Sequence, residues 1–250
     1  MSTIIGNYVG GSRLNQKGGT LQEVYNPSTG EVSAKVRFTS ESEIDEVVEV
    51  ASAATPLWSA TAPSKRSQVM YRFKDLLEKN ADKIASAISS EHGKTHNDAL
   101  GEVSRGLEAV EFSCGIPHLL KGTYSEQVAT SIDVYSIPQP LGIVAGITPF
   151  NFPAMVPMWM FPNALACGNA FILKPSERDP SVSLILADLL KEAGLPDGIF
   201  NVVQGDKVAV DAILEHPEIM AVSFVGSTPI AEYIYTRAAS KGKRVQALGG

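Results

Sequence analysis

The stretch IVAGITPFNFP at residues 143–153 combines a short β-branched run with a rigid loop of aromatic residues and prolines. Four more short apolar runs follow it, at 170–173, 199–203, 221–225 and 244–248. Helical or apolar stretches fill the gaps, at 153–167, 180–193, 207–214 and 228–240. Strands that alternate with helices predict an α/β fold with a doubly wound parallel sheet of five strands. Continuous rather than alternating apolar strands indicate that helices cover both faces of this sheet.

The sequence before this sheet has a different character. The first forty residues predict short strands around the turn NPSTG at 26–30, and helical periodicity then dominates up to residue 122. Residues 123–140 predict an extended hairpin that ends in prolines. We therefore expect three parts: strands and a helical layer over 1–122, a hairpin over 123–140, and the parallel sheet over 141–250.

Composition excludes several classes of protein. The chain has 250 residues, of which 44% are hydrophobic and 19% charged, so it can bury a sizeable core. Its net charge of -6 lacks the basic footprint of a nucleic-acid-binding protein. Two cysteines do not make a disulfide scaffold, which favours a reducing compartment. Without a leader or a long apolar stretch, we expect a cytoplasmic protein with neither nucleic acid nor membrane as a partner.

The loops that leave the predicted strands contain the candidate site residues. In open parallel sheets, ligands bind beyond the carboxyl ends of the strands. The candidate positions at four of these ends are Thr148, Pro149, Phe150 and Asn151, then Lys174, Ser176 and Glu177, then Gly226 and Ser227, and finally Ala247, Leu248 and Gly249.

Each of these positions also has a purely structural interpretation. Gly226 and Ser227 at a helix start could bind a pyrophosphate, but without a GxGxxG pattern a simple helix cap is favoured. Lys174 and Glu177 could bind ribose hydroxyls, with Glu177 repelling a 2′-phosphate, or they could form a surface ion pair. The Asn151 amide could donate to a developing oxyanion or form an Asx turn.

A set of motifs in a fixed order connects the chain to a known family. They are NPSTGE at 26–31, PFNFP at 149–153, ALACGNA at 164–170, LKPSE at 173–177, FVGST at 224–228 and LGG at 248–250. With this set the whole chain resembles the aldehyde dehydrogenase superfamily. The resemblance implies an NAD-binding, Rossmann-like sheet, incomplete at its C-terminal end, over 141–250. It also implies that 123–140 is an oligomerisation hairpin of a homodimer or homotetramer.

The same resemblance implies roles for individual residues. Asn151 would be the side-chain donor of the oxyanion hole. Lys174 and Glu177 would hold the adenosine ribose of NAD, and Ser227 would meet its pyrophosphate. The other positions at the strand ends would complete the cofactor site, namely Thr148, Pro149, Phe150, Ser176, Gly226, Leu248 and Gly249.

One departure from the family pattern bears on the reaction. In hydrolytic members a glutamate, the general base that activates water, precedes the LGG motif, whereas this chain has Ala247. A methyl group cannot accept a proton, and a thiol such as coenzyme A needs less activation than water. The chain therefore resembles the CoA-acylating methylmalonate-semialdehyde dehydrogenases, with which it shares HGKT at 92–95, GEV at 101–103, RGLE at 105–108 and GSTPI at 226–230.

This resemblance implies a complete reaction. Methylmalonate or malonate semialdehyde would be oxidised with NAD, and the acyl group would pass to coenzyme A, with loss of the substrate carboxylate as CO2, to give propionyl-CoA or acetyl-CoA. The alternatives are a hydrolytic NAD(P)-dependent semialdehyde dehydrogenase, in which Ala247 is a chance substitution, and a non-catalytic dinucleotide-binding fragment. The family's catalytic cysteine is expected beyond Gly250, so we expect this chain alone to be inactive. Cys114 and Cys167 are predicted to be buried small hydrophobes.

Arg105 and a pair of histidines are further candidates for a binding site. Arg105, on a helix expected to begin at Asn97, is the candidate for binding the carboxylate of the substrate, because guanidinium groups bind carboxylates bidentately. Glu102 and Glu108, three residues away on either side, make a surface ion pair the structural alternative. The histidines at 92 and 96 have the spacing of a metal pair, but Gly93 should end the helix between them, so no metal site is predicted.

Overall fold

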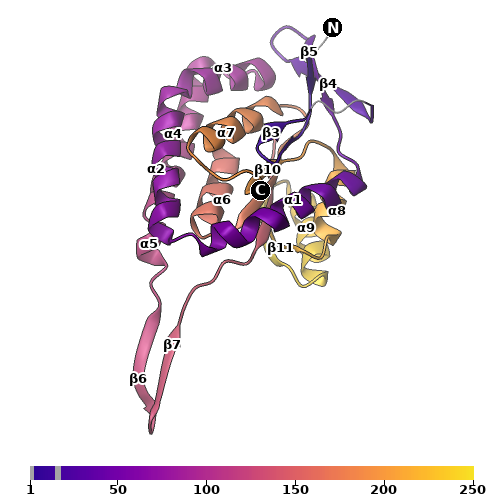
Figure 1. The fold of residues 1–250 in the computed structure, drawn as a ribbon. Coiled ribbons are helices and arrows are strands. Elements are labelled where there is room, and N and C mark those ends of the chain that lie inside the picture. Colours follow the sequence, from indigo (N-terminus) through magenta and orange to yellow (C-terminus); the bar gives the residue numbers. More distant parts are fainter. Residues whose placement is uncertain (1–2, 15–17) are drawn as a thin grey trace.

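The largest sheet of the protein contains the five predicted strands, all parallel, in a computed structural model that describes residues 3–14 and 18–250 (Figure 1). They are β8 (Ile143–Ile147), β9 (Ala170–Lys174), β10 (Phe200–Val202), β11 (Ile219–Gly226) and β12 (Arg244–Gly249). Their spatial order is β12-β11-β8-β9-β10. This is the doubly wound order: β9 and β10 follow on one side of β8, and β11 and β12 on the other, so the strand order reverses between β8 and β11. The predicted α/β fold class is confirmed.

Helices cover both faces of this sheet. One face packs against α6 (Met155–Ala166) and α7 (Ser181–Glu192), and the opposite face packs against α1 (Glu41–Ala60), α8 (Lys207–Glu215) and α9 (Thr228–Ser240). Every residue of β8, β9 and β10 is buried, which explains why these strands are continuously apolar. The helices place the carboxyl ends of the strands, and the loops that leave them, along one open edge.

The sheet is larger than the sequence predicted, because an N-terminal hairpin extends it. Strand β2 (Tyr8–Val9) pairs antiparallel with β10, and β3 (Ser12–Arg13) pairs with β2. Gly10 and Gly11 connect these two strands, both with positive φ, as a two-residue hairpin turn requires. A strand edge offers free backbone N–H and C=O groups, and this hairpin satisfies those of β10. The sheet therefore has seven strands instead of the five predicted, and the two added strands are antiparallel to their neighbours.

The other N-terminal strands form a separate small sheet. Its order is β1-β5-β4, with β1 (Thr3–Ile5) parallel and β4 (Leu21–Asn26) antiparallel to β5 (Glu31–Arg37). It lies at the end of the molecule near α3 (Figure 1).

A second layer of helices packs on α6 and α7. It consists of α2 (Pro63–Lys79), α3 (Ala81–His92), α4 (His96–Cys114) and the short α5 (Ile116–Leu119). Gly93, with φ of +85°, ends α3. Helix α4 begins one residue before the predicted Asn97, because the Thr95 hydroxyl caps it by accepting a hydrogen bond from the Asp98 N–H at 3.2 Å. Within the described part of the chain, no helix has the length and apolar character needed to cross a bilayer.

Aromatic side chains join the layers at the centre of the core. The Phe161 ring on α6 lies 4.9 Å from that of Phe200 on β10 and 5.8 Å from that of Phe73 on α2. Phe161 and Phe73 are fully buried. This cluster packs the seven-stranded sheet against α6 and the second helical layer.

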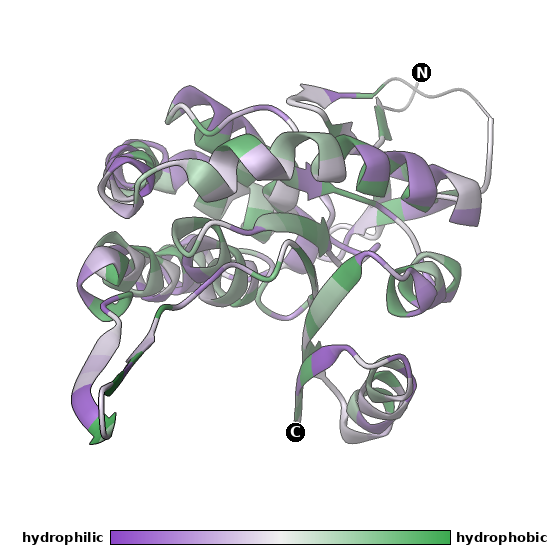
Figure 2. Ribbon diagram, turned by 60° about the horizontal axis from the view of Figure 1, so that its bottom comes forward, coloured by the Kyte–Doolittle hydropathy of each residue, from purple (hydrophilic) through white to green (hydrophobic). Residues whose placement is uncertain are grey.

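The hairpin predicted over 123–140 forms β6 (Thr123–Ala129) and β7 (Ile132–Ser136) and projects away from the rest of the protein (Figure 1). None of its residues is buried. Its exposed large apolar side chains are Tyr124, Val128, Ile132, Val134 and Tyr135. Figure 2 shows apolar segments along this projection. A solvated two-stranded hairpin is marginally stable by itself.

Candidate functional site

A groove of about 610 Å³ lies at the carboxyl ends of β8 and β9, where helices α8 and α9 form its other wall. It sits next to the point at which the strand order reverses, which is where ligands bind in doubly wound sheets. Six of the residues singled out from the sequence line it: Thr148, Pro149, Phe150, Lys174, Ser176 and Glu177. Another hollow, of about 650 Å³, lies against β4 and α3, away from most of the strand-end loops.

Lys174, the last residue of β9, is the buried cation of the groove. Its side chain donates a hydrogen bond to Glu177 Oε2 at 3.2 Å. The ion pair of the structural alternative therefore forms, but Lys174 is only 5% exposed, so the pair is not a surface one. Burial lowers the pKa of Lys174, while Glu177 acts in the opposite direction. Among the described residues Glu177 is its one side-chain partner, which leaves ammonium N–H groups for a ligand.

The Thr148 hydroxyl is a polar group of the groove that is left unpaired. Thr148 follows β8 directly, and its buried hydroxyl oxygen makes no hydrogen bond to any of the residues that the structure describes. Ser176, also buried, accepts a hydrogen bond from the Arg178 N–H at 3.1 Å. The Phe150 ring stacks on the His92 ring with 6.1 Å between their centres, and the Arg178 guanidinium lies over the Phe150 ring, 4.7 Å from its centre. The groove therefore combines an aromatic wall with unfilled hydrogen-bonding capacity.

Gly226 and Ser227, which precede α9, lie beside the groove and do not line it, whereas Pro229 and Ile230 in the first turn of α9 do. Ser227 is the N-cap residue and is exposed, and its hydroxyl makes no capping hydrogen bond, so a simple side-chain cap does not explain it. Gly226 and Gly249 have a packing role. A Cβ on Gly226 would lie 2.4 Å from the Phe224 ring, and one on Gly249 would lie 2.9 Å from the Thr228 Cα. These glycines let β11, β12 and α9 meet closely.

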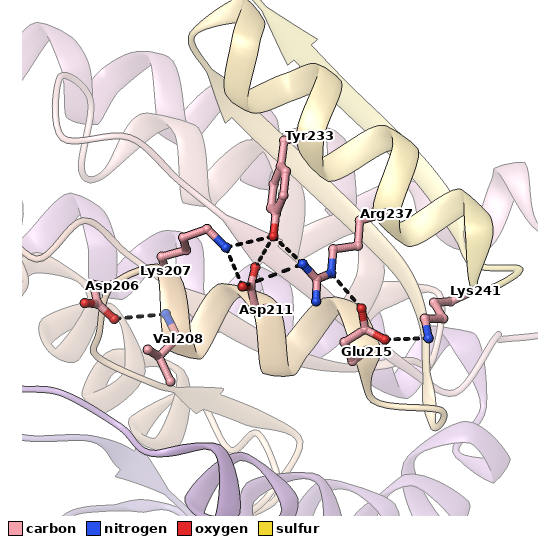
Figure 3. Close-up of polar contacts among 8 residues, drawn as sticks. All are labelled: Asp206, Lys207, Val208, Asp211, Glu215, Tyr233, Arg237 and Lys241. Carbon is pink, nitrogen blue, oxygen red and sulfur yellow. Dashed lines mark hydrogen bonds and ion pairs between the residues drawn. The ribbon is translucent and has the colours of Figure 1, made fainter.

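The wall formed by α8 and α9 was missed from the sequence. Asp206 caps α8 and lines the groove together with Lys207 and Tyr233. The Tyr233 hydroxyl accepts hydrogen bonds from Lys207 at 2.9 Å and Arg237 at 2.6 Å, and donates one to Asp211 at 2.6 Å (Figure 3). This network links the two helices and so sets the width of the groove. The sequence does contain a signal for these residues: GDK at 205–207 follows the third predicted strand, in the same way as the candidate loops follow the other four strands.

The loop that carries Asn151 continues from the groove towards α6. Asn151 is exposed and does not line the groove. Its backbone carbonyl accepts a hydrogen bond from Lys94 Nζ at 2.5 Å. Lys94 in turn forms an ion pair with Glu102 Oε2 at 2.6 Å. The HGKT and GEV motifs thus lie directly beneath this loop.

Arg105 is exposed on α4, one helical turn beyond Glu102. The structural alternative, a surface ion pair of Arg105, does not form with Glu102, because Glu102 is only 1% exposed and pairs with Lys94. Within the described residues, Arg105 has no hydrogen bond or ion pair. Its guanidinium is therefore available to a ligand carboxylate.

The remaining candidates lie outside the groove. Ala247 is half-buried on β12, directly opposite Phe224 of β11, and Leu248 is half-exposed.

Cys114 is buried as predicted, and burial raises the pKa of its thiol to about 11, which disfavours the nucleophilic thiolate. Cys167 is only partly buried, and burial raises its pKa as well. Among the described residues, no group of three or more His, Cys, Asp or Glu side chains could hold a metal ion.

Comparison with known proteins agrees with this arrangement. Residues 14–250 match the aldehyde dehydrogenase family. A malonate-semialdehyde dehydrogenase of Pseudomonas aeruginosa is 59% identical over 93% of this chain and 47% of its own length. An acylating, mitochondrial methylmalonate-semialdehyde dehydrogenase of Arabidopsis thaliana is 50% identical over 98% of this chain and 40% of its own length.

Solved structures give the same result. A structure described as that of a methylmalonate-semialdehyde dehydrogenase from Sinorhizobium meliloti, complexed with NAD, has a TM-score of 0.98 and 56% identity. The match covers 100% of this chain and 51% of that one. The chain thus spans about half the length of the relatives it matches, corresponding to their N-terminal half. With a family match over 14–250 and the site at the expected edge of the sheet, the chain belongs to the aldehyde dehydrogenase family.

Proposed function

We propose that this chain is the cofactor-binding half of an NAD-dependent enzyme that oxidises methylmalonate or malonate semialdehyde and transfers the acyl group to coenzyme A. The observation that carries the proposal is the groove at the ends of β8 and β9, with its buried Lys174 beside Glu177. The names of the relatives support the substrate class, and the Sinorhizobium relative supports NAD.

The residues of the groove fit the adenosine part of NAD. Lys174 and Glu177 offer a donor and an acceptor to the two ribose hydroxyls, and the orphaned Thr148 hydroxyl offers another hydrogen bond. The Glu177 carboxylate also opposes a 2′-phosphate by like-charge repulsion, which favours NAD over NADP. The free Ser227 hydroxyl at the start of α9 suits the pyrophosphate. When bound, NAD takes the hydride that the aldehyde loses.

The chemistry on the substrate involves Asn151 and Arg105. A thiolate adds to the aldehyde carbon and creates an oxyanion, to which the exposed Asn151 amide donates a hydrogen bond. Because neither Cys114 nor Cys167 favours the thiolate, we place this nucleophile in the part of the enzyme outside this chain. Arg105, which has no partner among the described residues, binds the substrate carboxylate.

The acyl acceptor follows from Ala247. After hydride loss the acyl group is a thioester, and its release needs a nucleophile. Ala247 offers no base to deprotonate water, so a thiol, which is a few per cent ionised at neutral pH, is the better acceptor. Coenzyme A attacks the thioester carbon, and the enzyme thiolate leaves.

The test uses the full-length enzyme. NADH formation from methylmalonate semialdehyde should continue past one turnover only when coenzyme A is present. Introducing a base by Ala247→Glu should create CoA-independent turnover. Steady turnover of the unaltered enzyme without any thiol would instead establish the hydrolytic alternative.

Arg105→Lys provides a second test. It should raise KM for the carboxylated semialdehydes far more than for a neutral aldehyde such as propanal, since lysine loses the bidentate geometry. An equal rise for both substrates would assign Arg105 to another role.

We further propose that the enzyme is a cytoplasmic homodimer or homotetramer that assembles through the hairpin of β6 and β7. The exposed apolar residues of this hairpin support the proposal. Light scattering should report a smaller mass for Val134→Asp than for the unaltered enzyme. An unchanged assembly would exclude the hairpin as the interface.

A further inference from the structure

A buried ion pair lies beneath the Asn151 loop, outside the NAD groove. Lys94 follows the end of α3, Glu102 lies on α4, and their charged atoms are 2.6 Å apart. The Lys94 side chain is 15% exposed and that of Glu102 is 1% exposed. Burying two charges is costly, so this pair contributes little to stability compared with an apolar pair of the same size. Its contacts indicate what it does instead.

Both members of the pair bind the backbone of the same loop. Lys94 Nζ donates to the Asn151 carbonyl at 2.5 Å and lies 4.0 Å from the centre of the Phe152 ring. Glu102 Oε1 accepts the backbone N–H groups of Ala154 at 2.8 Å and of Met155 at 3.2 Å. These two N–H groups lie at the start of the twelve-residue helix α6, where a carboxylate is favoured by the helix dipole.

The pair therefore clamps the loop on both sides of the Asn151 side chain. That side chain is exposed, and its amide has no hydrogen-bond partner among the described residues. The direction of the amide thus depends on the backbone that carries it. Lys94 fixes that backbone through the carbonyl of Asn151 itself, and Glu102 fixes the point at which the loop becomes helix.

We propose that Lys94 and Glu102 are positioning residues that aim the Asn151 amide at the oxyanion. The inference deepens the proposed function and rests on it. Neither side chain touches the substrate in this role; the pair acts through Asn151. Because Glu102 and Arg105 are one turn apart on α4, the same helix also sets the distance between the oxyanion donor and the group that binds the carboxylate.

The test is a double-mutant cycle in the full-length enzyme. The variant Lys94→Met/Glu102→Gln removes both charges together, so no unpaired charge remains buried, and the glutamine oxygen can still accept the N–H groups that start α6. Of the contacts that hold the loop, it therefore loses the hydrogen bond from the Lys94 ammonium to the Asn151 carbonyl. The cycle combines this variant with Asn151→Ala. The matched control is Lys74→Met/Glu78→Gln, which removes an ion pair of 2.7 Å on α2, away from the loop.

Three quantities are measured for each variant: the rate constant of the first turnover of NADH formation, the dissociation constant of NAD, and the midpoint of thermal unfolding. Asn151→Ala should slow the first turnover by about 10²- to 10³-fold, as removal of an oxyanion donor does. The pair variant should slow it by about 10- to 100-fold, as misplacement of a catalytic group by about 1 Å does. NAD binding should stay within about twofold for all variants, because none of these residues lines the groove.

The decisive comparison is made in the Asn151→Ala background. If the pair acts through Asn151, its removal there should change the first turnover by less than about twofold. A loss of the same size in both backgrounds would overturn the proposal, as would an equal loss in the Lys74 and Glu78 control. If the pair variant does not fold, Lys94→Gln enters the same cycle with the same expectation.

Failure of the proposed function gives a different result. If the unaltered full-length enzyme forms no NADH from any aldehyde, the proposed function falls and this inference falls with it. If NADH forms without need of coenzyme A, only the acyl acceptor is wrong. The cycle then still decides the role of Lys94 and Glu102, because the first turnover does not require the acceptor.

Discussion

Replacing Lys174 by methionine should stabilise the protein and at the same time weaken NAD binding. Lys174 is 5% exposed, and burial lowers its pKa, so folding disfavours the charged form. The folded state then binds fewer protons than the unfolded state, and this destabilisation fades as the pH rises above the folded-state pKa. At neutral pH, removing the buried charge should therefore raise the free energy of unfolding, provided that the remaining partner, Glu177, keeps its access to water.

The same substitution removes the groove's buried donor. A hydrogen bond to a charged group contributes about 1.5–3 kcal/mol. The dissociation constant of NAD should therefore rise by about 10- to 150-fold. Glu177, whose side chain is 30% exposed, can be hydrated once Lys174 is gone, so it should not offset the gain in stability.

Lys243 provides a matched control. It is 8% exposed, and burial lowers its pKa too, but its Nζ donates to the backbone carbonyls of His216 and Ile219, the latter at 2.7 Å. Lys243→Met should strand these carbonyls and lower the free energy of unfolding by about 1–3 kcal/mol. NAD binding should not change, because Lys243 does not line the groove.

Urea unfolding followed by circular dichroism at pH 7 and pH 9 gives the stabilities, and calorimetric titration gives the NAD affinities. The two methionine variants should differ in the sign of the stability change, and the advantage of Lys174→Met should shrink once the pH exceeds the folded-state pKa of Lys174. Equal destabilisation by both variants, with NAD affinity unaltered in Lys174→Met, would refute the assignment of Lys174 as a ligand-binding cation.

Three other predictions follow from single residues. Glu177→Gln removes the carboxylate beside Lys174 and should raise the affinity for NADP relative to NAD by about 10-fold or more, which competitive titration would detect; an unchanged preference would place the selectivity elsewhere. Burial and the nearby Glu91 raise the pKa of Asp179 to about 8, so the folded protein holds a proton there that the unfolded chain has lost. Its stability should fall as the pH rises towards 8, by up to about 1.4 kcal/mol per pH unit, and Asp179→Asn should abolish this slope; a variant whose unfolding midpoint follows the unaltered protein at every pH contradicts this origin. Phe161→Ala should cost about 3–5 kcal/mol of unfolding free energy, because the ring on α6 contacts both the sheet and the second helical layer; a loss below about 1 kcal/mol would mean that neighbouring side chains fill the cavity.

Local periodicity was sufficient for the central sheet. The run at 143–147 becomes β8 at the predicted bounds, since a strand buried on both faces must be apolar at every position. The rule that ligands bind at the carboxyl ends of strands then selected Thr148, Lys174 and Glu177, which line one groove. Both inferences use neighbours in the chain or the general geometry of parallel sheets, so one sequence contains what they need.

Contacts between distant segments were not predictable in this way. The pairing of Tyr8 with Val202 depends on which edge of the sheet remains free, and nothing near Tyr8 in the sequence specifies that edge. Glu102 illustrates the same limit for the site. Helical spacing placed it next to Arg105 as a surface partner, whereas packing turned it inwards to Lys94 and the start of α6.

The sequence by itself therefore determined the order of strands and helices, the polar residues at the strand ends and the family to which they belong. These depend on backbone periodicity and on residue types at fixed spacing. The tertiary structure alone decided that Lys174 is a buried cation, that α8 and α9 close the groove, and that Lys94 and Glu102 clamp the Asn151 loop. The physical reason is that burial and charge pairing arise when segments far apart in the chain pack together and exclude water.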